Sequence, residues 1–123
     1  GEYLNGKKWN GKEYDNDGNL IYELKNGNGK ICLYDSYDGK LYFEGEYLNG
    51  EKNGKGKEYL TDHLMFEGEY LNGKRNGKGK EYWYTGNLSF EGEYLNGKRN
   101  GKGKDYLNNQ LIYEGEYINW LFK

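Results

Sequence analysis

The sequence contains no alanine, valine or proline, and it has only one cysteine and one histidine. The lone Cys32 cannot form an internal disulfide. This favours a reducing compartment such as the cytoplasm, although a secreted protein without bridges is also compatible. No apolar run reaches the length of a transmembrane helix, and no signal peptide is visible.

The residues that are present are mainly charged, aromatic or glycine. The 18 basic and 20 acidic side chains almost cancel, leaving a net charge of −2. Nucleic-acid binders are usually strongly basic, so this balance argues against that class. A hydrophobic content of 34% is typical of a disordered chain, but the aromatic content of 18% opposes this interpretation. Aromatic residues are favoured in strands and alanine is not, so the composition indicates β-structure.

An internal repeat decides the fold class. Equivalent glycines are spaced by 23, 24 and 23 residues, at Gly45, Gly68, Gly92 and Gly115. We therefore interpret residues 1–123 as one domain of about five repeats plus a C-terminal half repeat. The copy at 20–34 is degenerate, and the first copy is short and carries Trp9 in its turn. The clearest copies are Phe43–Tyr59, Phe66–Tyr82 and Phe90–Tyr106.

Each repeat alternates with the period of a β-strand, since Phe66, Gly68 and Tyr70 share one parity and the intervening glutamates share the other. Turn-forming residues follow, so the unit predicts a β-hairpin with a loop at 73–76. Pairing opposite charges in that register sets Glu69 against Lys80 and Phe66 against Trp83, and it lays the Tyr70 ring over Gly79.

The connection to the next hairpin follows the same logic of opposite charges. A turn at Thr85–Gly86 pairs Lys80 with Glu91 and Lys78 with Glu93. A three-residue loop at 108–110 likewise keeps Lys104 against Glu114. One face of the sheet then carries Glu and Lys ladders, and the other carries aromatic residues and glycine.

The predicted fold is all-β: an array of β-hairpins that forms one elongated, curled, single-layer antiparallel sheet. Ten or eleven strands are expected, and the glycine rows should bend the sheet toward the aromatic face. The concave lining is therefore predicted to be aromatic. A closed barrel is the competing architecture, and the unequal end repeats argue against it.

With the residues arranged in this way, the chain resembles the MORN repeat family. The shared pattern is Phe66-Glu-Gly68-Glu-Tyr70-x-x-Gly73-x-x-Asn76-Gly77-x-Gly79, and a tail of Lys80-Glu-Tyr82 followed by Gly86-x-Leu88 is similar to the MORN-variant repeat. The resemblance covers essentially the whole chain, with departures in 1–14 and 20–34. It implies an elongated hairpin sheet with a role in scaffolding and protein–protein contact. In some members it implies association with membranes or phosphoinositides.

The aromatic row is the first candidate binding surface, because we expect a single layer to leave one side of its rings exposed. Acids on the same face are expected either to help bind a basic peptide or to solvate the groove rim; they are Glu13, Glu58, Glu81 and Asp105. The aromatic row itself consists of Phe43, Tyr47, Phe66, Tyr70, Trp83, Phe90, Tyr94 and Tyr117.

The hairpin turns supply a second candidate surface. Lys74, Arg75, Lys98 and Arg99 would form a basic rim along one edge, suited to anionic lipid head groups or to an acidic partner, although solvated turn residues are the simpler interpretation. At the C-terminal end, the apolar residues Trp120–Phe122 break the repeat. Residues 118–123 are therefore expected either to cap the last strand or to join a second copy through the terminal strands.

Catalytic chemistry is not expected of this chain. His63 lies in a predicted loop, Cys32 is expected to be a small buried filler, and no cluster has metal-ligand spacing. We therefore predict no metal, no cofactor, no nucleic acid and no enzymatic activity. The sequence favours an interaction scaffold with an unidentified protein partner, and the alternative is a peripheral membrane or phosphoinositide-binding module.

Overall fold

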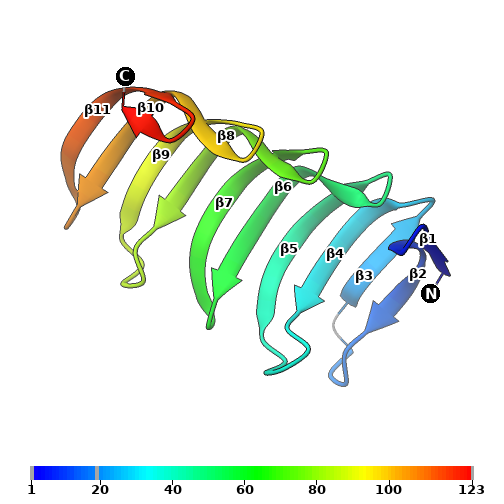
Figure 1. Ribbon diagram of the computed structural model, residues 1–123. Coiled ribbons are helices and arrows are strands. Elements are labelled where there is room, and N and C mark those ends of the chain that lie inside the picture. Colours follow the sequence, from blue (N-terminus) through cyan, green and yellow to red (C-terminus); the bar gives the residue numbers. More distant parts are fainter. Residues whose placement is uncertain (1, 19, 123) are drawn as a thin grey trace.

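The computed structural model describes residues 2–18 and 20–122, the side chain of Phe122 excepted. The regular secondary structure of these residues consists of β-strands that form one sheet. Neighbouring strands in the sheet are also consecutive in the chain (Figure 1). The strands are β1 (Glu2–Leu4), β2 (Lys7–Tyr14), β3 (Leu20–Lys25), β4 (Asn28–Tyr34), β5 (Leu41–Leu48), β6 (Glu51–Leu60), β7 (His63–Leu71), β8 (Lys74–Tyr82), β9 (Leu88–Leu95), β10 (Lys98–Leu107), β11 (Gln110–Ile118) and β12 (Leu121–Phe122).

The sheet is an open, elongated, antiparallel array, as predicted. Its linear order places β1 and β12 at the two ends, and Figure 1 shows them far apart. The closed barrel is therefore wrong. With strands about 4.8 Å apart, the array is roughly 50 Å long. The described residues form 12 strands, more than the ten or eleven expected, because the segments near the two ends form short strands.

The hairpins turn more tightly than the sequence analysis predicted. Asn72 and Gly73 have φ angles of 51° and 85°, which are typical of a two-residue type I′ turn. The predicted four-residue loop at 73–76 is therefore wrong, because Lys74 already belongs to β8. Likewise Trp9 lies within β2 rather than in a turn. The loop predicted at 108–110 is also shorter, since β11 begins at Gln110.

This tight turn changes the register inside each hairpin. Glu67 faces Lys80 and Gly68 faces Gly79, whereas nearer the turn Tyr70 faces Arg75. One residue of β7, Glu69, thus lies opposite three of β8, residues 76–78, which is a β-bulge that bends the hairpin. The predicted pairs of Glu69 with Lys80 and of Phe66 with Trp83 are wrong for this reason.

The register between successive hairpins agrees with the prediction. Lys80 faces Glu91 and Lys78 faces Glu93 across β8 and β9. Lys104 likewise faces Glu114 across β10 and β11. Opposite charges therefore do select the pairing where no bulge intervenes.

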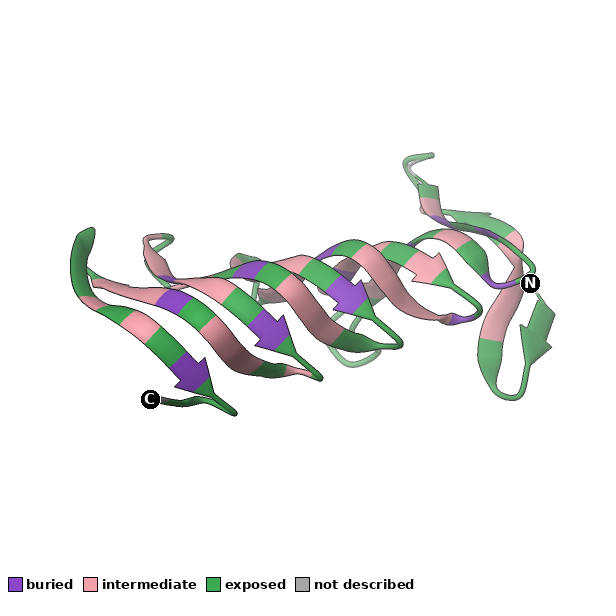
Figure 2. Cartoon of the chain, turned by 90° about the horizontal axis from the view of Figure 1, so that it is seen from above, coloured by how far each residue is buried: buried purple, intermediate pink, exposed green. Residues whose placement is uncertain are grey.

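Aromatic rings over glycine form the core. A Cβ added at Gly79 would lie 2.6 Å from Cε1 of Phe66, so the Phe66 ring covers that glycine. Tyr70 instead covers Gly56 of the preceding hairpin, where an added Cβ would lie 2.8 Å from its ring. The expected seat of Tyr70 over Gly79 is therefore wrong, and each of these tyrosines packs against the neighbouring repeat. Figure 2 shows buried and exposed bands alternating along single strands.

Hydrogen bonds between successive turns fix the stacking of the hairpins. The Gly97 amide donates to the Arg75 carbonyl at 2.8 Å, and the Asn96 amide donates to Asn76 Oδ1 at 3.1 Å. Equivalent backbone bonds recur along the same edge. They join Gly27 to Trp9, Gly50 to Gly27, Gly73 to Lys52 and Trp120 to Arg99.

Candidate functional site

A groove of about 1390 Å³ lies on the Glu/Lys face of the sheet. It runs from Leu20 on β3 to Glu116 on β11. Its described lining residues include glutamates, lysines and glycines but no aromatic residue. The prediction of an aromatic concave lining is therefore wrong.

The sign of the groove's charge alternates from strand to strand. Lys78 and Lys80 flank Gly79 on β8, whereas Glu91 and Glu93 flank Gly92 on β9. Two parallel rows of side chains thus border a floor of backbone, and each row alternates between lysine and glutamate. The remaining charged lining residues are Lys30, Glu44, Glu46, Lys55, Lys57, Glu67, Glu69, Lys102, Lys104, Glu114 and Glu116.

Glutamates of one row accept hydrogen bonds from tyrosines of the same face. Tyr82 Oη donates to Glu67 at 2.6 Å, and Tyr106 Oη donates to Glu91 at 2.9 Å. Burial, together with the adjacent carboxylate of Glu67, raises the pKa of Tyr82 to about 12. These tyrosines are therefore neutral donors that fix the carboxylates along one wall of the groove.

Glutamates of the other row bind backbone amides that the bulges leave without a ladder partner. Glu69 accepts from the Lys78 amide at 3.0 Å, and Glu93 accepts from the Lys102 amide at 2.8 Å. Such bonds to a carboxylate are stronger than those between neutral groups. Glu69 thus stabilises the bulge of its own hairpin, a role that the predicted register concealed.

The lysines of the groove have fewer partners than the glutamates. Lys55, Lys57, Lys78, Lys80 and Lys102 are exposed. Within residues 2–18 and 20–122, no carboxylate oxygen lies within 4.0 Å of their ammonium groups, whereas Lys104 lies 3.8 Å from Glu114. These ammonium groups are available to a ligand.

The aromatic row is a core rather than a surface. Six of its eight side chains are buried, and the Phe66 and Phe90 rings have 0% of their surface exposed. Rings pack edge to face, with the Phe66 centroid 5.8 Å from Tyr70 and 5.2 Å from Tyr94. The expectation that one side of each ring stays open is wrong for these six, because the bent hairpin ends cover them. The buried six are Phe43, Phe66, Tyr70, Phe90, Tyr94 and Tyr117, while Tyr47 is half-buried and Trp83 is 45% exposed.

Arginines complete that cover. The Arg75 guanidinium carbon lies 3.9 Å from the centre of the Phe66 ring, and the Arg99 carbon lies 4.0 Å from that of Phe90. Cation–π contacts of this kind are attractive, and the guanidinium plane also excludes water from the ring.

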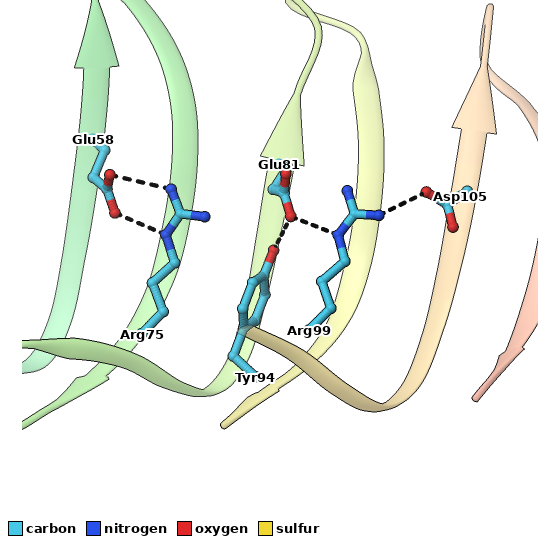
Figure 3. Close-up of polar contacts among 6 residues, drawn as sticks. All are labelled: Glu58, Arg75, Glu81, Tyr94, Arg99 and Asp105. Carbon is cyan, nitrogen blue, oxygen red and sulfur yellow. Dashed lines mark hydrogen bonds and ion pairs between the residues drawn. The ribbon is translucent and has the colours of Figure 1, made fainter. Parts of the chain in front are cut away.

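The same arginines bind acids of the preceding repeat (Figure 3). Arg75 donates to Glu58 through Nε at 2.9 Å and through Nη2 at 3.1 Å, and Tyr70 Oη donates to the same carboxylate. Burial disfavours the charged carboxylate, but the hydrogen bonds from Arg75 and Tyr70 outweigh it and lower the pKa of Glu58. The acid of each repeat therefore joins it to the next.

The second of these clusters extends through a further acid. Glu81 accepts from Arg99 Nε at 2.9 Å and from Tyr94, and Arg99 Nη1 lies 3.3 Å from Asp105 Oδ1 (Figure 3). Burial raises the pKa of Asp105 although Arg99 opposes the shift. Neither the peptide-binding nor the solvation hypothesis for these acids foresaw this structural role.

The predicted basic rim is consequently half as large as expected. Lys74 and Lys98 are exposed at the turns, but Arg75 and Arg99 are half-buried and ion-paired. A guanidinium forms two directed hydrogen bonds and stacks on a ring, which a lysine does not do as well. In each Lys-Arg pair that follows a turn, the lysine therefore carries an exposed charge and the arginine carries one that is paired inside the sheet.

The remaining candidates have simple surroundings. The His63 ring stacks on Tyr84 with centroids 3.8 Å apart. Cys32 is half-buried and lines the N-terminal part of the groove, where burial raises the pKa of its thiol. Within the described residues, no group of three or more His, Cys, Asp or Glu side chains could hold a metal ion, and no helix could span a membrane.

The regular part of this array matches a known family. The model of the MORN repeat matches residues 43–65, 66–88 and 90–104, which carry the bulged hairpins and the Phe-over-glycine core. The chain is a MORN repeat protein. The MORN match begins at residue 43, after the degenerate hairpin 20–34, so the departures seen in the sequence lie outside it. No curated protein compared with the chain matches it.

MORN repeats are a non-catalytic type of repeat, found in scaffolds and in membrane-associated proteins. The groove residues of this MORN array were missed as a site because the sequence presents them as paired charges. The alternation of these charges along the sheet was evident in the sequence. Their partners inside each hairpin depend on the bulge, which the sequence did not reveal.

Proposed function

We propose that this MORN array is a non-enzymatic scaffold that binds a protein partner in the Glu/Lys groove. The observation that carries the proposal is the contrast between the two faces. The aromatic face is sealed by its own arginines, whereas the groove face presents exposed lysines without a carboxylate within 4.0 Å among the described residues. A partner therefore meets the charged face first. The single Cys32 is the basis for placing this activity in a reducing compartment such as the cytoplasm.

Capture from a lysate of the source tests the scaffold with three matched proteins. These are the unaltered chain, a groove variant with Lys78→Gln and Lys80→Gln, and a turn variant with Lys74→Gln and Lys98→Gln. The proposal expects proteins that the first and third retain and that the groove variant loses, with unchanged circular dichroism for all. Equal capture by all three would contradict the assignment to the groove.

A second candidate, binding to anionic membranes, rests on the edge formed by the Asn-Gly turns. Leu71 and Leu95 are each 48% exposed, and they face Lys74 and Lys98 across the hairpin ends. Exposed leucines beside lysines suit the interface of an anionic bilayer. Arg75 and Arg99 do not contribute, because Glu58 and Glu81 pair them.

Liposome flotation separates this candidate from the scaffold. Binding to vesicles with anionic lipid should weaken as salt rises and should be lost when Lys74 and Lys98 become Gln and Leu71 and Leu95 become Ser. A matched control carries Lys78→Gln and Lys80→Gln in the groove. If the unaltered chain never floats, membrane binding is wrong and the scaffold remains.

We also propose that the terminal strands mediate a homodimer. β1 and β12 are edge strands, and the exposed fractions of Trp120 and Leu121 are 41% and 71%. Trp120 already packs on Tyr94, with ring centroids 6.3 Å apart, which also fits an internal cap. The side chain of Phe122 and all of Lys123 lie outside the described residues. Light scattering on the chain and on a version ending at Ile118 should show a dimer that becomes a monomer, and two monomers would contradict it.

A further inference from the structure

We infer that the occupant of the groove is a single extended polypeptide segment that lies across the strands and carries one acidic and one basic side chain in every three residues. This inference rests on the proposed scaffold function and names the chemistry of its partner. Three properties of the groove carry it: its length, its charge period and its balance of signs.

The length of the groove suits an extended chain. The lining runs from β3 to β11, which is eight steps between strands and therefore about 38 Å. An extended segment of about twelve residues, rising ~3.1 Å per residue, fills this length.

The charge period selects the spacing of the ligand's side chains. Both flanks of one strand carry the same sign, as with Lys78 and Lys80 on β8, and the sign repeats on every second strand. That period is about 9.6 Å. A polyproline II chain rises about 9.3 Å in three residues, so a charged residue at every third position stays in phase with the groove. An α-helix needs seven residues, about 10.5 Å, to return to the same face and loses phase along the array.

The balance of signs excludes ligands with one kind of charge. A polyanion would meet the Lys78 and Lys80 pair on β8 but the Glu91 and Glu93 pair on β9, only about 4.8 Å away. A polycation would meet the reverse arrangement. A segment with alternating acidic and basic residues can place each against the opposite sign, and such complementarity provides specificity more than affinity.

The structure also indicates which side chains of the groove would become ordered when the segment binds. Glu69 and Glu93 are held in place by backbone amides, and Glu67 and Glu91 are held by tyrosines. The acidic half of the pattern is therefore preorganised. The lysines are exposed, so binding would order mainly their side chains.

Fluorescence anisotropy with designed peptides tests the inference on the full chain. The probe is a labelled peptide of about twelve residues in which the triplet Glu-Lys-Ser repeats, long enough to fill the groove. One control has the same composition with the acidic, polar and basic residues in blocks. A second control carries the same charges at a seven-residue period in a helix-forming sequence. The inference expects the triplet peptide to bind about tenfold more tightly than either control, and to weaken at about 0.15 M salt.

Two groove variants and one matched control link that binding to the site. Lys78→Gln with Lys80→Gln should weaken the triplet peptide about five- to tenfold, and Lys78→Glu with Lys80→Glu should weaken it further. Lys74→Gln with Lys98→Gln, at the turns outside the groove, should leave it unchanged. Thermal melts verify that each variant is folded, and the Gln pair keeps the test valid if charge reversal disturbs the ladder.

Other results would contradict the inferred occupant or the proposed function. Equal affinity for the triplet and block peptides, or binding unaffected by the Gln pair, overturns the inferred occupant. If the triplet peptide fails but a lysate protein is captured by the chain and lost from the groove variant, the occupant is wrong and the scaffold stands. If capture by the groove fails as well, the proposed function is also wrong.

Discussion

The regular hairpins and the degenerate hairpin β3–β4 fill the core side of the sheet with different residues. In β7–β8, Gly68 faces Gly79 and the Phe66 ring covers both. In β3–β4, the equivalent pair is Tyr22 and Ile31, whose own side chains are buried to 4% and 2% exposure. Large side chains on the strands thus replace a ring that reaches over two glycines.

The two hairpins also differ in their second strand. β3–β4 pairs without interruption from Tyr22 to Lys25, so it has no bulge near its turn. Counted from the turn glycine, β4 reaches Ile31 two residues sooner than β8 reaches Gly79. The residues absent from β4 correspond to Lys74 and Arg75 of β8. Without the bulge there is no unpaired amide for Glu23, which instead lies 3.8 Å from Lys12.

The edge formed by the turns is the same in both regions. The Gly27 amide donates to the Trp9 carbonyl at 2.7 Å, as the Gly97 amide does to Arg75 at 2.8 Å. The comparison teaches that the hydrogen bonds between turns set how the hairpins stack, while the core tolerates a different set of apolar residues.

The largest difference between the regions should come from truncating their cores. Phe66→Ala leaves a cavity beneath Arg75 and should reduce the free energy of unfolding by about 3–5 kcal/mol. Leu24→Ala, in the degenerate hairpin, should cost about 2–3 kcal/mol. Urea denaturation followed by tyrosine and tryptophan fluorescence measures both, and equal losses would contradict the special role of the ring.

Introducing a core residue of the degenerate hairpin into a regular hairpin should reduce stability by a smaller amount. Gly79→Ile places its Cβ against the Phe66 ring and should reduce the free energy of unfolding by about 1–3 kcal/mol. Adding Phe66→Leu should recover part of this loss, because the smaller side chain leaves room for the added isoleucine. Ile31→Val is the control, with an expected loss of about 0.5–1.5 kcal/mol. Purely additive losses in the double variant would show that the two sites do not interact.

The acids that join repeats predict a pH dependence confined to the regular region. The pKa of Glu58 is lowered in the folded chain. Its stabilisation is therefore complete above the pKa of the unfolded chain, about 4.3, and is lost as the pH falls through the lower folded value. Glu58→Gln should cost about 1–2 kcal/mol at pH 7 and less below pH ~4.

Glu13→Gln is the matched control for this pH dependence, because Glu13 is exposed at the corresponding position. Stability measured by urea denaturation at several pH values should change little in this variant. A loss from Glu58→Gln that stays constant down to pH ~3 would mean that the carboxylate charge is not what stabilises the contact.

The smallest expected effect concerns the bulge. Glu69→Gln weakens the bond to the Lys78 amide and should cost about 0.5–1 kcal/mol. Glu23→Gln, where no bulge exists, should be nearly neutral. Thermal melts of the two variants measure the difference, and equal shifts in Tm would show that Glu69 does not support the bulge.

Alternation and repetition were sufficient to predict hairpins, their linear order and the pairing between hairpins. Opposite charges such as Lys80 and Glu91 provided the last of these. The register inside each hairpin was not predictable from charge, because Lys80 finds a glutamate in either register. Glu67 and Glu69 lie on the same face, and the bulge decides between them. Four of the predicted site residues, Lys74, Arg75, Lys98 and Arg99, were correctly placed near the turns but differ in exposure.

The sequence by itself determined the all-β array and its division into two chemically distinct faces, since strand side chains alternate strictly and the repeat copies that alternation. The tertiary structure alone decided which face is open. The bulge bends each hairpin end so that Arg75 and Tyr70 cover the ring of Phe66, and the neighbouring repeat supplies Glu58 to hold them. These contacts join residues of different repeats and depend on a backbone distortion, and neither is visible in a pattern along one strand.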